Sequence, residues 1–485
     1  MIMGSPKLLA TGQRTSRLRQ VVVVSVGLLA LYVFLRMPEA SLDSSRTVLD
    51  ASFSSSSSVP GGGSGAAFGA AGSSLSDALL NNRFLTASQC TEAFPGLTKE
   101  IDDVVTKGTF KLEKSGSLGP LVARIKDGEL SILQHASRSD LSRDMLAHRT
   151  ATLHQIHSAL LTWPPGGSVP DTVFAFSHHD SPSAGTFSYS RPADPARNGA
   201  GAPYFPVPHF SHWAWPLPFV RSLPHAAGAI AALERRLGGW RHKEPRAVWR
   251  GTPHFNSPST TSARLRQDLL LSAAGRPWAD IEALAWTSAG RNASNALPIA
   301  DFCRYRYIVH TEGITYSGRL QFHQLCQSVI LTPPISWMQH TSHLIRPVFS
   351  SSLPGVERRP RVGKDLGGGV KEKVSLATYP APWVQMAWGK GSAAEEANMV
   401  FVAPDWSDLE STVLWLEKHP RVAEGIARRQ REVFHGAGYL SPAAEMCYWR
   451  AAIRGWSQTV DYTGQGFEEL EGIPFEEFIL TEAQR

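Results

Sequence analysis

Two arginines stand at places where a folded chain could bind an anion. Arg319 ends the polar run EGITYSGR (312–319), which separates an apolar segment from a helix candidate. A cation in the first turn of a helix opposes the helix dipole unless an anion lies nearby, and a diphosphate would supply that anion. Arg250 also follows a short apolar segment, and the adjacent Gly251 would let a phosphate approach the backbone. We therefore expect Arg250, Gly251 and Arg319 to converge on a diphosphate.

Each of these residues also has a purely structural interpretation. Arg319 could pair with Glu312 on the surface, and the tetrapeptide WRGT (249–252) is too short to be specific by itself. Arg264 and Arg266 lie farther along the chain, where a helix candidate begins. At most one of these two arginines could share Arg250's side and contribute to the anion site, and for either of them we expect a solvated helix face.

A third polar cluster, HHDSP (178–182), follows an apolar strand candidate. One hypothesis is that His178, His179 and Asp180 coordinate manganese. Consecutive residues of a strand point to opposite faces and serve one ion poorly, so we predict no metal site here. Asp180 could also act only as a turn residue that caps Ser181. The four cysteines form no CxxC pair, which gives a zinc site little support.

The elements that would position these clusters alternate between strand and helix. The expected strands are Thr172–Ser177, Ala247–Gly251, Arg306–Thr311, Ser328–Pro334 and residues 399–404. The expected helices are Thr261–Ala274, Gly318–Gln327 and two further helices after a capping box at residues 407–410. His419-Pro420 separates these last two helices. Strand, helix and strand in succession form a βαβ unit, which predicts a parallel sheet. Ligands of such sheets bind beyond the carboxyl ends of the strands.

The N-terminus predicts the compartment. Residues Val21–Leu35 carry no charge, and they are preceded by Lys7, Arg14, Arg17 and Arg19. The positive-inside rule then predicts a cytosolic tail (1–20), a single-pass type II signal anchor (21–36) and a Ser/Gly-rich stem (37–88) that holds the body in the lumen of the endoplasmic reticulum or Golgi. A cleaved signal peptide is the alternative.

The remaining chain is long enough for two domains. We expect an N-terminal domain over 89–240, a C-terminal domain over 241–445 with an insertion at 350–398, and a closing helix and tail over 446–485. The formal charge is +6, but the 48 Lys and Arg residues are scattered, so a nucleic-acid binder is not expected. Cys90, Cys303, Cys326 and Cys447 allow three complete disulfide pairings. Asn292 begins the one N-glycosylation sequon.

An aromatic, proline-rich passage (204–224) is too broken by proline for a regular helix or a central strand. Sugar rings stack on aromatic faces, so Phe210, Trp213 and Trp215 are candidate binding residues. Packing between domains is the alternative for all three.

Four motifs in order resemble glycosyltransferase family 90, which contains capsule-associated xylosyltransferases of fungi and protein O-glucosyltransferases of animals. The motifs are Trp249–Thr252 (WRGT), Cys303–Leu331 (CRYRYIVHTEGITYSGRLQFHQLCQSVIL), Val400–Pro420 and Cys447–Arg450. The resemblance implies a GT-B fold, in which two Rossmann-like domains face a cleft and the C-terminal domain holds a UDP-sugar. It also implies an inverting mechanism that requires no cofactor, although a need for a divalent metal is left open.

The resemblance also assigns roles to residues. Asp180 matches the family's catalytic base, and Arg250 and Arg319 would stabilise the departing UDP. Gly251, Glu312, Tyr316 and Ser317 would complete the donor site, while Phe210, Trp213 and Trp215 would line the acceptor site.

The reaction expected from the resemblance is transfer of xylose or glucose to a hydroxyl of a glycan or protein. The rival hypotheses are a metal-dependent transferase of GT-A type that uses the His178-His179-Asp180 cluster, and a catalytically inactive luminal lectin or scaffold with the same fold.

Overall fold

The computed structural model describes residues 75–483, apart from residues 115, 117, 118, 198–202, 257–262, 288, 289, 291 and 360–377. The predicted cytosolic tail, the predicted anchor and most of the predicted stem lie outside the described residues. None of the helices in the described part of the chain is long and apolar enough to cross a membrane.

The first of two six-stranded sheets is built mainly from the N-terminal half of the described chain. Its order is β16 (Ile473–Pro474), β3 (Glu129–Gln134), β2 (Leu121–Lys126), β4 (Thr172–Phe176), β5 (Thr186–Ser188) and β7 (Tyr204–Pro206). Strands β2 and β3 pair antiparallel, and β4, β5 and β7 are parallel. All five residues of β4 are buried, as its unbroken apolar run predicts. The sheet is therefore mixed, whereas the sequence analysis expected a Rossmann-like, parallel one.

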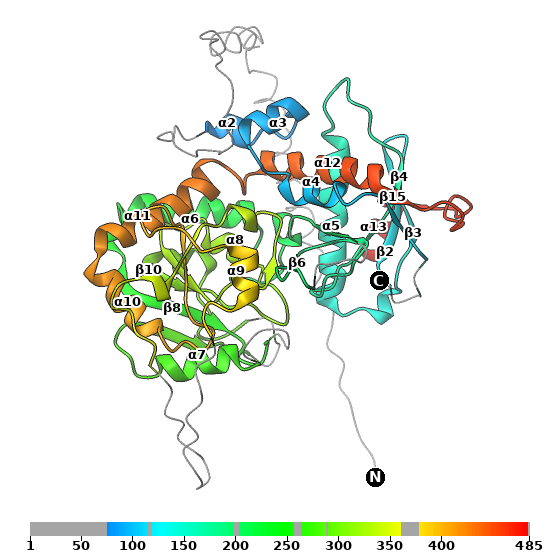
Figure 1. Cartoon of the computed structure of the whole chain (residues 1–485). Helices are drawn as coiled ribbons and strands as arrows, with labels where there is room; N and C mark the ends of the chain where they lie inside the picture. Colours follow the sequence, from blue (N-terminus) through cyan, green and yellow to red (C-terminus); the bar gives the residue numbers. More distant parts are fainter. Residues whose placement is uncertain are drawn as a thin grey trace, which may run out of the picture. The chain divides into compact units, whose positions relative to one another are not determined.

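The C-terminal helix α12 (Pro442–Thr459) belongs to the core of this first sheet, and in Figure 1 it crosses above α5 (Arg143–Leu161). Trp449 and Trp456 on α12 are fully buried against strand residues such as Phe187. A disulfide joins Cys447 on α12 to Cys90 on α3 (Ala87–Ala93). The shorter elements of this region are α2 (Asp77–Leu80), α4 (Lys99–Val105), β1 (Phe110–Lys111), β15 (Val460–Asp461) and α13 (Phe475–Ala483).

The second sheet is entirely parallel. Its order is β13 (Pro347–Phe349), β14 (Met399–Phe401), β11 (Val329–Thr332), β10 (Tyr305–Val309), β8 (Glu244–Gly251) and β9 (Ala279–Ala283). The strands predicted at β8, β10, β11 and β14 are confirmed, and so is the parallel pairing of β10 with β11. The sequence analysis missed β9 and β13. Strand β9 lies at the sheet's edge and is only partly buried, so its sequence ADIEA lacks the apolar run of a central strand.

Helices cover both faces of the second sheet. Leu residues of α6 (Leu223–Leu237) and α8 (Leu320–His323) share one apolar cluster with alternate strand residues such as Ile308. The remaining strand residues, such as Tyr307, pack with α7 (Leu265–Ala273), α10 (Leu409–Lys418) and α11 (Pro420–Arg431). Figure 1 shows α6 and α8 above β8 and β10, and α7 below them. This part of the chain is therefore Rossmann-like.

The strand order creates a switch point between β8 and β10. From β8 the chain runs outward to β9, and it then crosses to the other side of β8 to form β10. The connections on the two sides of this boundary diverge, which leaves room for a ligand beyond the carboxyl ends of the two strands. The residues that follow these ends are Thr252 and the segment 310–319.

Two predicted helix features are wrong. The helix expected over Gly318–Gln327 is only the four-residue α8, and turns replace its second half, where Cys326 is bonded to Cys303. The capping box at residues 407–410 does not form, because Asp408 rather than Ser407 is the N-cap residue of α10 and the Ser407 hydroxyl donates to the Asp405 carboxylate at 2.7 Å instead. The break at His419-Pro420 is confirmed, since α10 ends at Lys418 and α11 begins at Pro420.

The predicted insertion (350–398) contributes to the core at both of its described ends. Leu353 is buried with the cluster of α7 and α10, and Val384 on α9 (Pro382–Trp388) is buried with the cluster of α6. The Tyr379 hydroxyl donates to the carbonyl of Phe401 in β14 at 2.5 Å. The described parts of this segment therefore pack into the core and are not a surface insertion.

Arg450 on α12 joins three chain segments without an acidic partner among the described residues. Its guanidinium donates to the carbonyls of Arg83 at 2.8 Å, Thr162 at 2.7 Å and Leu85 at 3.0 Å. The side chain is buried, and this burial lowers the pKa of Arg450 to about 10. It thus satisfies carbonyls at the end of α5 and before α3.

We expect Arg450→Met to lower the free energy of unfolding by about 2–4 kcal/mol, because three carbonyls lose the buried donor that joins their segments. Denaturant unfolding of the two proteins measures the difference. Arg454→Met is the control on the same helix, since Arg454 is only partly buried over the Trp163 ring. Equal losses in both variants would contradict the role given to Arg450.

Candidate functional site

The carboxyl ends of β8 and β10 are held together by side chains. The Trp249 Nε1–H of β8 donates to the Thr311 hydroxyl beyond β10 at 3.1 Å. Gly251 ends β8, and a Cβ there would lie 2.5 Å from Cζ2 of Trp249. The structure thus requires glycine at 251 for close packing against the indole, a reason that differs from the phosphate approach expected from sequence.

Arg250 is bound to the edge strand. Its guanidinium donates to the Asp280 carboxylate at 2.6 Å, to the Asp280 carbonyl at 2.8 Å and to the Trp249 carbonyl at 2.9 Å. Only its backbone carbonyl faces Arg319, which donates to it. The expectation that the guanidiniums of Arg250 and Arg319 converge is therefore not met, because β9 brings a carboxylate to Arg250 from 30 residues away.

Arg266 on α7 takes the place expected for Arg250. It is buried, its Nε–H donates to the Glu312 carbonyl at 3.0 Å, and its Nη1–H donates to the Thr252 carbonyl at 3.0 Å. Burial and the positive charge of Arg319 lower the pKa of Arg266 to about 9. Arg266 therefore spans the switch point from the end of β8 to the loop after β10.

The expectation of a solvated helix face is wrong for Arg266, although the spacing of apolar residues in α7 indicates that it is buried. The buried residues of α7 are Leu265, Arg266, Leu269 and Ala273, so Arg266 lies three and seven residues before two apolar positions of the same face. Arg264, in contrast, is exposed and lies 3.9 Å from Asp268, as expected for a solvated face. The helical spacing could have separated these two arginines.

Arg266 and Arg319 form a cationic pair with no carboxylate beside it among the described residues. Burial alone lowers the pKa of Arg319 to about 10, and no acidic group offsets the shift at either arginine. In the described chain, the guanidinium groups of both arginines donate to backbone carbonyl oxygens. Two like charges in a low-dielectric setting are unfavourable until an anion joins them. The switch point is therefore a candidate anion site.

Helix α8 is too short for its dipole to attract an anion strongly to this site. Arg319 is the N-cap residue of α8, as the sequence analysis placed it near a helix start. A helix of four residues contributes little dipole, however. The attraction for an anion thus rests on the two guanidiniums rather than on a helix N-terminus.

Asp180 follows β4 and approaches the same loop from the first sheet. The Thr315 hydroxyl donates to the Asp180 carbonyl at 2.7 Å. The Asp180 side chain is exposed at the surface, yet desolvation by the neighbouring protein raises its pKa above the ordinary value, and the neighbouring His179 partly opposes this rise. A carboxylate with a raised pKa is a stronger base than an ordinary aspartate.

Tyr316 lies on the Asp180 side of the loop. Its ring centre is 6.2 Å from that of Tyr189 and 5.5 Å from that of His209. Burial first, and then the charge of Asp180, raise the pKa of the Tyr316 phenol well above its usual range. The hydroxyl is buried and has no hydrogen-bond partner in the described part of the chain. The half-buried Ser317 accepts at its carbonyl from the Leu320 N–H.

Glu312 does not pair with Arg319. Its Oε1 accepts from the N–H groups of Ser336 at 3.0 Å and Trp337 at 2.9 Å. Burial raises the pKa of Glu312 to about 8, so the side chain is a neutral acid at pH 7. The surface ion pair considered as an alternative for Arg319 is therefore wrong.

The three aromatic residues of the 204–224 passage have different surroundings. Phe210 is buried and stacks on His148, with ring centres 3.6 Å apart. Trp215 is half-buried, 5.3 Å from His209. Trp213 is 42% exposed and stacks flat against His154, so it is the one of the three with substantial open surface. Asn292 of the sequon is exposed.

The described residues offer no good metal cluster at the His178-His179-Asp180 segment. The one group of three described ligand-type residues within 4.8 Å is Glu234, Cys303 and Cys326, whose two cysteines are joined in a disulfide. His178 is buried without a partner for either ring nitrogen, and burial lowers its pKa to about 3. The imidazole of His178 is therefore neutral.

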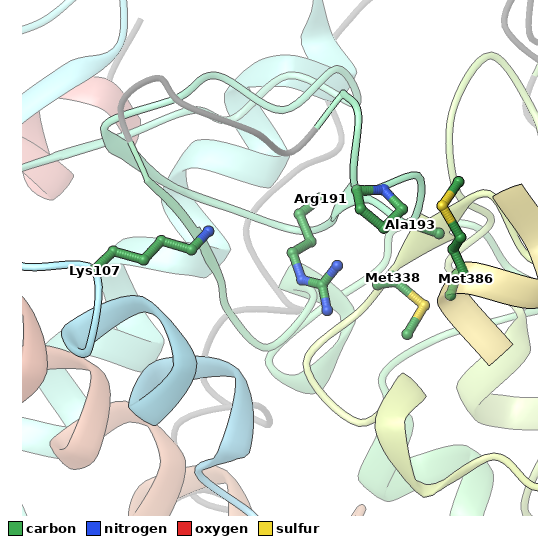
Figure 2. A pocket seen from close by; sticks show the side chains of 7 residues that line it. Lys107, Arg191, Ala193, Met338 and Met386 are labelled. Atoms are coloured by element: carbon green, nitrogen blue, oxygen red, sulfur yellow. The ribbon is translucent and has the colours of Figure 1, made fainter. Parts of the chain in front are cut away.

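A cavity of about 360 Å³ lies between α4 and α9, and none of the predicted site residues lines it. Its lining residues are Lys107, Arg191, Ala193, Pro195, Met338, Met386 and Ala387. Figure 2 shows Arg191 between Lys107 on one side and the two methionines on the other. Arg191 is already paired with the buried Glu100 at 2.5 Å.

Comparison with known proteins supports a sugar-transfer family. Residues 129–350 match the family described as Glycosyl transferase family 90, a range that includes Asp180, Arg266 and Arg319. The chain is also 24% identical over 239 residues to a protein of Anopheles gambiae named O-glucosyltransferase rumi homolog. The match covers 48% of this chain and 46% of that protein, so the chain spans about half the length of the curated relative it matches.

The protonated state of Glu312 predicts a pH dependence of stability. Its pKa is about 8 in the folded protein, against 4.5 as the ordinary value, so the unfolded chain releases this proton first as the pH rises. Between pH 5 and pH 8 this group therefore makes stability fall with pH. Glu312→Gln keeps the acceptor oxygen and removes the proton, so its melting temperature should fall less over that interval than the parent's. Parallel curves for the two proteins would argue against a neutral Glu312.

Proposed function

Because residues 129–350 place this chain in glycosyl transferase family 90, we propose that it is an inverting glycosyltransferase. The donor is a UDP-sugar, and the acceptor is a hydroxyl group of a glycan or a protein. The observation that carries this proposal is a pair of cations, the buried Arg266 and the half-buried Arg319, at the switch point of the parallel sheet. In the proposed GT-B arrangement, the second sheet holds the nucleotide and the first sheet supplies the base.

The two guanidiniums would bind the diphosphate of the donor. When the bond from the sugar to the diphosphate breaks, negative charge builds on the leaving UDP. Arg266 and Arg319 have carbonyl partners already and carry charge that no described carboxylate neutralises. Their fixed positions mean that little reorganisation is needed as the charge develops. A diphosphate would also relieve the repulsion between them.

Asp180 would act as the general base. The acceptor hydroxyl attacks the anomeric carbon from the side opposite the leaving diphosphate, and its proton passes to the Asp180 carboxylate late in the step. The raised pKa of Asp180 favours this transfer. The link from Thr315 to the Asp180 carbonyl supports a location of the base beside the loop at residues 312–319 (the donor loop). Attack from the opposite side inverts the configuration of the sugar.

Other residues complete the proposed site in different ways. Glu312 and Ser317 lie on the donor loop, and the neutral carboxyl of Glu312 suits a contact to a sugar or ribose hydroxyl. Tyr316 lies near the proposed base, Asp180. Among the aromatic residues, Trp213 is the one we retain as an acceptor contact, because Phe210 is buried.

This scheme assigns the neutralisation of diphosphate charge to arginines and routes no step through a metal. Activity that persists in EDTA is its expected result. Loss of activity in EDTA and recovery with manganese would favour the metal-dependent alternative. If the parent protein neither binds UDP nor hydrolyses the donor, the result would favour an inactive scaffold with this fold.

The disulfides support a location in the secretory pathway. Cys90–Cys447 and Cys303–Cys326 account for all four cysteines, and such bonds persist in oxidising compartments. The exposed Asn292 is available to glycosylation in the same lumen. We propose an endoplasmic reticulum or Golgi membrane protein anchored through residues 21–36. The name of the mosquito relative favours glucose as the sugar, and xylose is the second candidate.

We expect Asp180→Asn to abolish transfer while the dissociation constant for UDP stays within about twofold of the parent value. The amide keeps the size of the side chain but cannot take the proton. A transfer assay with UDP-glucose and UDP-xylose, together with calorimetric UDP titration, measures both quantities. Transfer by the variant at the parent's rate would rule out Asp180 as the base.

We expect Arg266→Met and Arg319→Met each to weaken UDP binding by about 1.5–3 kcal/mol, the range for a lost charge-assisted hydrogen bond. Arg276→Met is the matched control, because Arg276 is exposed and pairs with Glu410 at 3.6 Å. UDP titration of the three variants is the measurement. Unchanged UDP affinity in both site variants would refute the diphosphate assignment.

A further inference from the structure

The donor loop (residues 312–319) contacts segments that follow β4, β5 and β7 of the first sheet at three places. The Thr315 hydroxyl donates to the Asp180 carbonyl at 2.7 Å. The ring of Tyr316 packs against Tyr189 and His209. A Cβ at Gly318 would lie 2.5 Å from the His209 ring, so the backbone there approaches the imidazole closely. The donor loop is thus braced against the segment that carries the candidate base.

The segment that carries Asp180 has little other support. In the described chain, the Asp180 carboxyl makes no hydrogen bond, and the bond from Thr315 is the one that its backbone carbonyl accepts. Nearby, the His179 N–H makes a long 3.4 Å bond to Ser177, and Ser183 bonds to Ser188. Residues 180–182 therefore depend on Thr315 for their position.

The surroundings and shape of Thr315 fix the direction of its hydroxyl toward Asp180. Its side chain is buried, and a β-branched residue has few rotamers, so its hydroxyl keeps one direction. The Gly313 N–H donates to the Thr315 carbonyl at 2.8 Å, which closes a tight turn in the donor loop. On the other side of this turn, the Glu312 carbonyl accepts from Arg266. One short turn therefore joins the residue that touches Asp180 to the residue that touches the phosphate-binding arginine.

We propose that Thr315 is a positioning residue: its hydroxyl fixes Asp180 at the distance from the donor loop that in-line attack requires. This inference rests on the proposed function. An inverting reaction needs the base and the leaving diphosphate on opposite sides of the anomeric carbon, so the two must be held relative to each other. An error of about 1 Å in such an arrangement can cost about a hundredfold in rate.

Two substitutions separate this role from simple packing. Thr315→Val keeps the shape of the side chain and removes the hydroxyl, and Thr315→Ser keeps the hydroxyl and removes a methyl group. We expect Thr315→Val to lower kcat by about tenfold or more, with the dissociation constant for UDP within about twofold of the parent value. Thr315→Ser should keep kcat within about threefold of the parent. A merely structural threonine would be replaced better by valine than by serine.

Thr412→Val is the matched control. Thr412 is also a buried threonine whose hydroxyl donates to a carbonyl, that of Asp408 at 2.8 Å, but it lies in α10 away from the site. This variant should keep the parent's kcat. Melting temperatures of all variants report any loss of folding. The inference is overturned if Thr315→Val keeps the parent's kcat, if Thr315→Ser loses as much as Thr315→Val, or if UDP affinity falls in parallel with kcat.

A second measurement tests the link between Thr315 and Asp180 without any reaction. In Thr315→Val, the amides of His179 and Ser183, whose hydrogen bonds flank Asp180, should exchange with deuterated solvent about tenfold faster, and Thr315→Ser should restore the parent's rates. Unchanged exchange would overturn the inference whatever the activity. A parent protein without transferase activity, or an active Asp180→Asn variant, would instead refute the proposed function, and the exchange experiment keeps these two failures distinct.

Discussion

The structure depends on a pair of positive charges, one buried and one half-buried, that no carboxylate of the described residues compensates. Arg266 and Arg319 meet beyond the ends of β8 and β10, where carbonyl oxygens orient them and burial lowers the pKa of both. The neighbouring Glu312 does not relieve the charge, because burial keeps its carboxyl protonated and backbone N–H groups bind it. An arrangement of this kind is costly without a ligand and favourable with an anion.

The two sheets contribute different parts of the proposed chemistry. The parallel sheet supplies the anion site through its switch point, and the mixed sheet supplies Asp180 at the end of β4. The donor loop lies between them and contacts both, through Arg266 on one side and the Asp180 carbonyl on the other. The relative position of base and phosphate site therefore depends on a few contacts of one loop.

Local sequence patterns predicted much of the secondary structure. Unbroken apolar runs identified β4, β8, β10, β11 and β14, because strands in the middle of a sheet are buried on both faces. Pro420 separated α10 from α11, since proline cannot continue a helix that precedes it. The edge strand β9 escaped detection because half-buried strands lack such runs. The mixed pairing of the first sheet was not evident either, because pairing direction depends on how distant segments meet.

The sequence by itself determined the residue types, the order of strands and helices, and the loops in which Asp180 and Arg319 lie. Tertiary structure alone decided which arginine remains available to an anion. Arg250 looked suitable, yet folding brings Asp280 to it across the sheet edge, while Arg266 is turned inward on the apolar face of α7. A charge is free or neutralised according to its neighbours in space, and those neighbours come from strands and helices far apart in the chain. The bond from Thr315 to Asp180, which spans 135 residues, has the same origin.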